Sequence, residues 1–69
     1  MTINDLKPGD IITYSNNKTH YVNENKTFKY LKFYNKDMTN KTNKELDIIE
    51  VKRYISFFGL YRLKTIFRR

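Results

Sequence analysis

The sequence predicts a small, mainly β protein that folds as a highly curved, five-stranded barrel of the SH3-like or OB-like kind. Short runs of β-branched and aromatic residues recur along the 69 residues, and turn-forming residues separate them. Six tyrosines and five phenylalanines supply large side chains for a core that no disulfide supports. A chain of this length builds one core, and closing a small sheet removes its open edges. We therefore expect one barrel domain over residues 1–69.

The first strand, 11–14, is expected to follow a turn over residues 5–10. Pro8 fixes one backbone angle and Gly9 tolerates a positive φ, which together are typical of a type II turn. The strand itself, Ile-Ile-Thr-Tyr, is rich in β-branched and aromatic residues.

The second strand, 19–22, is predicted to return antiparallel from a hairpin over 15–18. Asparagine tolerates the positive φ of a type I′ turn, so Asn16 and Asn17 are expected to form a two-residue loop. Directly opposed side chains then share one face of the sheet. The expected pairs are Tyr14 with Thr19 and Ile12 with Tyr21.

A second turn over 23–26 leads to a third predicted strand, 27–34. Its apolar residues fall on both faces of the strand, as in a sheet that curls into a barrel. On one side are Phe28 and Tyr30, and on the other are Leu31 and Phe33. The polar segment 35–44 follows as a long loop with at most one helical turn, either a solvated connection or a recognition loop.

The C-terminal third contains the fourth and fifth predicted strands, 46–51 and 60–68, joined by an aromatic connection over 54–59 with Gly59 as its hinge. A helix over 60–69 is the alternative for the last segment, because Leu60, Leu63 and Phe67 also fit helical spacing. The β-prone run Thr-Ile-Phe at 65–67 favours the strand.

The charge is strongly one-sided. The formal net charge is +7, and no acidic residue follows Glu50. A surface of one sign attracts an oppositely charged partner over about a Debye length. The basic residues beyond that point are Lys52, Arg53, Arg62, Lys64, Arg68 and Arg69.

Composition and spacing argue against catalysis. There is no cysteine, the two glycines are fifty residues apart, and the single histidine, His20, has no evident catalytic partner. One histidine cannot build a metal site, so we expect no metal, no cofactor and no small-molecule substrate. The N-terminus lacks a secretory pattern, and no apolar run approaches the ~20 residues of a membrane span. These features indicate a cytoplasmic protein with no membrane partner.

Four pieces of the sequence, taken in order, resemble a group of small, uncharacterised proteins from bacteriophages and prophages of Firmicutes. The pieces are Asp-Leu-Lys-Pro-Gly-Asp at 5–10, Tyr-Asn-Lys-Asp-Met-Thr-Asn-Lys at 34–41, Asp-Ile-Ile-Glu-Val at 47–51 and Thr-Ile-Phe-Arg-Arg at 65–69. The resemblance implies a phage or mobile-element origin, a host-cell cytoplasmic location and an SH3-like barrel, and it implies no activity. The aromatic stretch 55–58 departs from the polar stretch usual there.

Nucleic acid is the first expected partner. On the predicted strand 60–68 the basic side chains alternate with apolar ones and point one way. Arginine grips phosphates, neutralised phosphates release counterions, and an exposed tyrosine stacks on bases. The alternative is that these basic side chains form the solvent-exposed face of a half-buried strand and bind nothing. The predicted contact residues are Lys52, Arg53, Tyr61, Arg62, Lys64, Arg68 and Arg69.

A host protein or nucleoprotein complex is the second expected partner. The aromatic run between 54 and 61 is too large for so small a core, and exposed aromatic patches mark protein contacts or self-association. The protein is then a monomer or a small homo-oligomer that modulates its partner. We expect Phe58 to plug one end of the barrel. For Phe57 the sequence does not decide between this buried position and an exposed one. The predicted interaction residues are Tyr54, Phe57, Phe58 and Tyr61.

Overall fold

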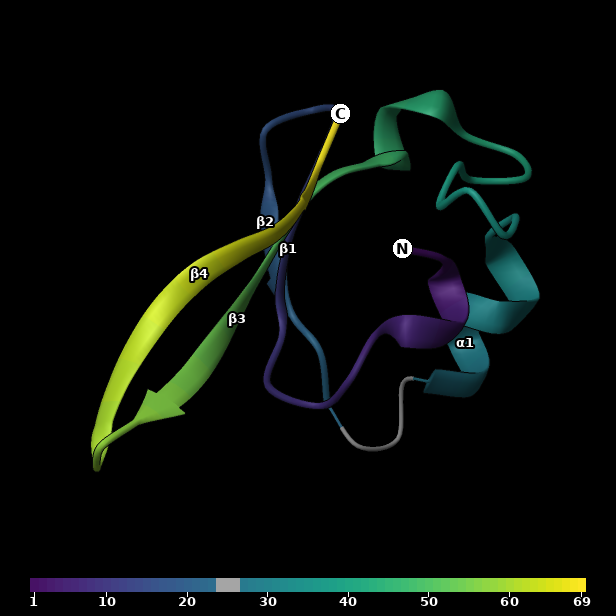
Figure 1. Ribbon diagram of the computed structural model, residues 1–69. Coiled ribbons are helices and arrows are strands. Elements are labelled where there is room, and N and C mark those ends of the chain that lie inside the picture. The colour runs from purple at the N-terminus through teal and green to yellow at the C-terminus, as the bar shows by residue number, and fades with distance from the viewer. Residues whose placement is uncertain (24–26) are drawn as a thin grey trace.

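The computed structural model of the protein describes residues 1–23 and 27–69 and is mainly β (Figure 1). Four strands form one antiparallel sheet in the order β2-β1-β3-β4. One short α-helix and two 3-10 helices complete the described elements. Their bounds are η1 Ile3–Asp5, β1 Ile11–Tyr14, β2 Thr19–Tyr21, α1 Thr27–Phe33, η3 Lys44–Leu46, β3 Ile48–Phe57 and β4 Leu60–Arg68.

The sheet is open, and the five-stranded barrel expected from the sequence is not what the described residues form. β2 and β4 lie at the two ends of the strand order and do not pair with each other. In Figure 1, α1 and η1 lie on one side of the sheet, and the far ends of β3 and β4 extend away from them as a long hairpin. The core therefore lies between a sheet and a helical layer, which is a different way of covering the apolar face.

The prediction of a strand over 27–34 is wrong, because this segment contains the helix α1. Tyr30 and Tyr34 are four residues apart and are both buried, with ring centroids 5.8 Å apart. Leu31 and Phe33 are exposed. Aromatic content suggested a strand, but the buried pair follows the helical repeat. The predicted turn at 23–26 falls largely on residues 24–26, which lie outside the described residues.

The hairpin between β1 and β2 forms where predicted, but its register is shifted by one residue. Thr13 pairs with Thr19 and Ile12 with His20. The cause is a longer loop: Asn17 adopts a φ of 67°, and the amide of Tyr14 donates to the carbonyl of Lys18. A turn followed by a residue in the left-handed region is the usual three-residue hairpin loop. The predicted pairs of Tyr14 with Thr19 and Ile12 with Tyr21 are therefore wrong.

The core combines residues from every layer of the fold. Ile12 on β1 faces Val51 on β3, which in turn faces Phe67 on β4, so one row of side chains crosses the sheet on its inner face. Tyr14, Ile66 and Phe67 are half-buried at the edge of this core. The buried apolar residues are Ile3, Leu6, Ile12, Val22, Tyr30, Tyr34, Met38, Ile48 and Val51.

The polar segment 35–44 is irregular, as predicted, but one of its residues belongs to the core. Met38 is completely buried although it adopts a φ of 69°. Its carbonyl accepts the amide of Ile48, and the neighbouring carbonyl of Lys36 accepts the amide of Ile3. The segment thus fastens the N-terminus and β3 together. None of the described helices is long and apolar enough to cross a membrane.

Candidate functional site

The most distinctive surface of the protein is the projecting part of the β3–β4 hairpin, residues 53–65, which we call the ribbon. β1 pairs with β3 only from Ile48 to Lys52, whereas β4 pairs with β3 as far as Phe57. The ribbon therefore has two strands, and none of the other strands described in residues 1–23 and 27–69 lies beside it (Figure 1). The predicted aromatic connection 54–59 is largely strand, because only Phe58 and Gly59 form the turn.

The ribbon ends in a tight turn with a phenylalanine at its tip. Phe58 and Gly59 have φ values of 51° and 80°, and Phe57 pairs with Leu60 across the turn. Positive φ at both central residues is the mark of a type I′ turn, in which asparagine and glycine are preferred. Phe58 is 90% exposed and meets Phe57 edge to face, with ring centroids 4.4 Å apart. The expectation that Phe58 plugs a barrel is wrong.

Large apolar side chains cover both faces of the ribbon. The four residues predicted from the sequence as interaction residues, Tyr54, Phe57, Phe58 and Tyr61, are all more than half exposed. Three more apolar residues of the ribbon are exposed: Ile55, Leu60 and Leu63. Leu60 belongs to the surplus of large apolar side chains that the sequence shows between 54 and 61, whereas exposure of Ile55 and Leu63 was not predicted.

The strand register divides the ribbon into two faces. Directly opposed residues of antiparallel strands point to the same side. One face carries Ile55, Phe57, Leu60, Arg62 and Lys64, and most of these residues line a shallow hollow. The opposite face carries Tyr54, Ser56, Tyr61 and Leu63. The first face is therefore apolar near the tip and cationic toward the sheet.

Arg53 does not belong to an open cationic surface, because it neutralises a buried carboxylate. Its Nε donates to Oδ1 of Asp10 at 2.7 Å, and its Nη2 donates to Oδ2 of Asp10 at 2.8 Å and to the carbonyl of Asp5. Asp10 is only 1% exposed and also accepts the amide of Lys7. Hydrogen bonding to Asp10 raises the pKa of Arg53. This bidentate pair fixes β3 to the turn that precedes β1.

Three more of the predicted cations have partners within the fold. Glu50 lies between Lys52 and Arg68, at 3.7 and 3.6 Å from their charged nitrogens. Arg69 donates to the carbonyls of Ile48 and Asp37 and so closes the C-terminus onto the core. The exposed pairs with Glu50 are weak, but they reduce the local positive charge.

Within residues 1–23 and 27–69, Arg62 and Lys64 are the predicted cations whose side chains form neither an ion pair with a carboxylate nor a hydrogen bond with the backbone. The register shifts between Lys52 and Val51, so that Val51 pairs with Phe67 and Lys52 with Thr65. As a result Arg68, opposite Glu50, lies on the outer face, whereas Arg62 and Lys64 lie on the same face as Arg53. The expectation that Arg62, Lys64 and Arg68 point one way does not match this register.

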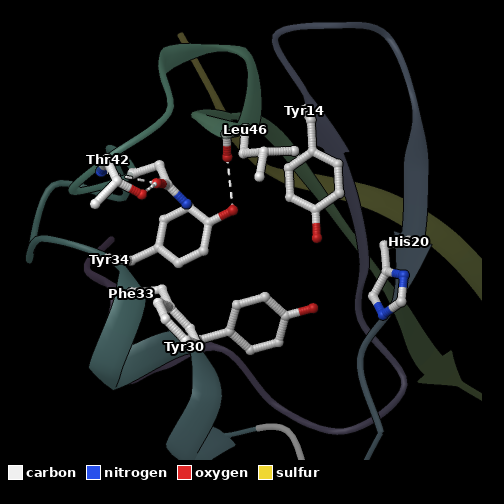
Figure 2. A pocket seen from close by; sticks show the side chains of 8 residues that line it. Tyr14, His20, Tyr30, Phe33, Tyr34, Thr42 and Leu46 are labelled. Carbon is white, nitrogen blue, oxygen red and sulfur yellow. Dashed lines mark hydrogen bonds between the residues drawn. The ribbon is translucent and has the colours of Figure 1, made fainter.

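A second concave site lies between the sheet and the helix, with a cavity of about 380 Å³. Figure 2 shows the side chains of Tyr14, His20 and Tyr30 pointing into a common space. The hydroxyl of Tyr34 donates instead to the carbonyl of Leu46 at 2.6 Å. The rings of Tyr14 and His20 are 6.4 Å apart. His20 reached this face through the shifted hairpin register, which sequence reasoning missed.

Burial raises the pKa of all three tyrosines around this cavity. It raises the pKa of Tyr34 to about 12, and the pKa values of Tyr14 and Tyr30 are also raised. These phenols are therefore neutral donors and acceptors at physiological pH and not bases.

Protein stability is expected to fall between about pH 10 and pH 12 because of this cluster. A raised pKa keeps Tyr34 protonated in the folded protein after the unfolded chain, with a tyrosine pKa of about 10, has lost its proton. The stabilisation is complete below pH 10 and is lost as the pH rises through the folded-state value. Urea unfolding at a series of alkaline pH values measures it, and Tyr34→Phe should make the decline shallower because it removes one of the three phenols. A wild-type profile without this decline would contradict the expectation.

Comparison of the chain with protein-family models, with curated proteins and with solved structures gives no match. The site is therefore interpreted from its own geometry.

Proposed function

We propose that this chain is a non-enzymatic binding protein that docks the tip and faces of its ribbon onto a partner protein. The observation that carries the proposal is Phe58, a bulky side chain held at positive φ and almost fully exposed at the tip. A positive φ is unfavourable for a residue of this kind, and exposure of the ring forgoes its burial. Apart from its contact with the exposed ring of Phe57, the Phe58 side chain contributes little to the fold, which supports a role in binding.

The rest of the ribbon supports the same reading. Tyr61 is 75% exposed and Leu60 is 71% exposed, in a segment that lies beyond the core. Contiguous apolar surface on a small protein marks an interaction site, and aromatic side chains beside arginine are the usual energetic centres of protein interfaces. The flanking cations Arg62 and Lys64 add a charged rim to the apolar tip.

The resemblance to phage and prophage proteins suggests where to search for the partner. A small protein of phage origin acts in the host cytoplasm, so the partner is a host protein or nucleoprotein complex whose activity the ribbon modulates. A defence nuclease and a polymerase are examples of such targets. The role is stoichiometric binding, without a cofactor or a metal.

Replacing Phe58 with asparagine is expected to stabilise the protein by about 0.5 kcal/mol and to abolish partner capture. Asparagine suits the left-handed conformation of this turn position, whereas the ring at the tip is lost. Thermal unfolding measures the first effect, and affinity capture from nuclease-treated host lysate measures the second. Opposite changes in stability and binding cannot arise from misfolding.

Leu31→Ala, which removes an exposed side chain on α1, is the matched control and should capture the same partner as the wild-type protein. If Phe58→Asn and a double Phe57→Ala, Tyr61→Ala variant both retain the captured protein, the ribbon is not the binding surface. If the partner is captured from untreated lysate but not from nuclease-treated lysate, the ribbon binds nucleic acid and not protein.

Nucleic-acid binding is the second candidate, favoured by Arg62 and Lys64 on one face of the ribbon and by the exposed ring of Tyr61 on the opposite face of the same strand. Two cations and one stacking ring make a small site, and binding through them should weaken steeply with salt. A mobility-shift assay with single- and double-stranded DNA and RNA at two salt concentrations tests it. No retardation at the lower salt concentration would exclude it.

A further inference from the structure

The sheet has two end strands of very different length. β2 contains three residues, whereas β4 contains nine and forms the outer edge of both the sheet and the ribbon. An end strand presents backbone amides and carbonyls that no neighbouring strand satisfies, and long exposed ones pair readily with another chain. Within the ribbon the 53–57 part of β3 is an open edge as well, but β4 is the longer one and is therefore the edge at which strand addition is to be sought.

The two-residue turn determines which amides of β4 face outward. In a hairpin closed by such a turn, the flanking residues Phe57 and Leu60 exchange hydrogen bonds, and hydrogen-bonded pairs then alternate along the ribbon. Arg62 and Lys64 consequently direct their backbone groups toward β3. The backbone amides that point away from β3, toward the open edge, are those of Tyr61, Leu63 and Thr65.

Two cationic side chains of β4 lie where they would face the side chains of a strand added to this edge. Arg62 and Lys64 share one face, and no acidic residue exists between Glu50 and the last residue of the sequence. A strand added to β4 would bring its own side chains to about 5 Å from these two positions. Acidic side chains at that distance are stabilising and basic ones are destabilising.

This pattern disfavours a second copy of the chain as the occupant. If two β4 edges paired antiparallel around Arg62, Leu63 or Lys64, residues with outward amides would bond one another. Centred on Leu63, this pairing places Arg62 of each copy opposite Lys64 of the other, and centred on Arg62 or Lys64 it places that residue opposite its own copy. Like charges directly opposite each other destabilise a sheet and are a common protection against self-association.

We propose that the open edge of β4 binds an extended acidic segment of the partner protein as an added strand. The segment carries two carboxylates two residues apart, opposite Arg62 and Lys64, and apolar residues at the alternate positions, opposite Tyr61, Leu63 and Thr65. Its backbone bonds the outward amides, and its register follows from the charges. The inference rests on the ribbon being the protein-binding surface and names the class of partner that it takes.

The test uses the full chain and a synthetic peptide as long as β4 in which glutamate alternates with valine. We expect binding by fluorescence anisotropy, with backbone amide shifts in NMR spectra centred on Tyr61, Leu63 and Thr65. The same peptide with lysine in place of glutamate should bind about tenfold or more weakly, because both charge pairs are reversed. Methylating the peptide's backbone nitrogens that face β4 should abolish binding. Equal binding of the acidic and basic peptides would overturn the proposal.

Two substitutions at one position separate the backbone from the side chain. Leu63→Pro removes an outward amide that β3 does not use, at an edge position where proline is tolerated, whereas Leu63→Ala keeps that amide. We expect Leu63→Pro to lose binding of the acidic peptide and Leu63→Ala to retain most of it. The methylated peptide gives the same answer if Leu63→Pro does not fold. Undiminished binding by folded Leu63→Pro would overturn the proposal.

The two proposals fail differently. If Phe58→Asn abolishes capture of the partner while Leu63→Pro leaves both capture and peptide affinity unchanged, the ribbon binds protein but β4 is not an augmentation edge. If the acidic peptide binds β4 but no tip variant affects capture, the edge is real and the aromatic tip has been assigned wrongly.

Discussion

Replacing Arg53 with methionine is expected to reduce the free energy of unfolding by about 3 kcal/mol. The methionine keeps most of the aliphatic volume, but the carboxylate of Asp10, which is 1% exposed, loses both hydrogen bonds from the guanidinium. Breaking a buried ion pair by removing one partner is costly because it leaves a charge uncompensated in the protein. Small domains have little stability in reserve, so a large unfolded fraction at 25 °C is the expected outcome. Urea unfolding followed by circular dichroism measures it.

Arg62→Met is the matched control, because Arg62 lies on the same face of the sheet but forms no ion pair with a carboxylate of residues 1–23 or 27–69. Its effect on stability should stay within about 0.5 kcal/mol. Equal stabilities of the two variants would mean that the contact between Arg53 and Asp10 contributes nothing to the fold. The assignment of Arg53 to the structure, away from a ligand surface, would then have to be withdrawn.

Ile12→Ala is expected to cost about 3 kcal/mol as well, through the loss of packing. Ile12 is fully buried and belongs to the row of side chains that crosses the sheet through Val51 to Phe67. Removing buried methyl and methylene groups loses their transfer free energy and leaves a cavity that the surrounding side chains only partly fill. Chemical denaturation with fluorescence detection, which reports on the buried tyrosines, measures the loss.

Leu60→Ala provides the comparison at the tip, where the side chain is 71% exposed. Its stability should change by no more than about 0.5 kcal/mol. A loss similar to that of Ile12→Ala would show that the ribbon is folded back onto the molecule in solution, contrary to its projecting position in Figure 1.

The sequence predicted the C-terminal strand well and the middle of the chain poorly. In β4 the period-two alternation and the run Thr-Ile-Phe agree with each other, and the strand begins and ends where expected. In 27–33, aromatic residues favoured a strand, while the spacing of Tyr30 and Tyr34 was compatible with the helix that forms. The β propensity of the aromatic residues favoured a strand, and the spacing of the two rings favoured a helix. Burial of the rings against the rest of the fold selects the helix, and the sequence of this segment alone does not show that burial.

The hairpin register shows how one local conformation changes an entire face. Asn16 and Asn17 were correctly identified as loop residues, but both two- and three-residue loops suit asparagine. The positive φ at Asn17 selects the longer loop, and His20 instead of Tyr21 then faces the core.

The candidate site was predictable in its aromatic part and not in its charged part. Exposure of the 54–61 aromatics follows from a surplus of large side chains over core volume, which composition alone reveals. Arg53 is not available to a ligand because it pairs with Asp10, and these two residues are 43 positions apart in the chain. Such long-range ion pairs are set by the folded topology, so a count of cations overstates the free positive charge.

β4 contains one extra residue at the register shift beside Val51 and Lys52. This bulge reverses the alternation of the side chains between the two faces of the strand. On the sheet side of Ile66, the alternation places Phe67 against the core, and on the ribbon side it leaves Leu63 and Tyr61 exposed. The two parts of the strand can therefore diverge separately over evolution. Pairs of residues added to or removed from the hairpin would change its reach without inverting either pattern, whereas a single-residue change in one strand would exchange its faces.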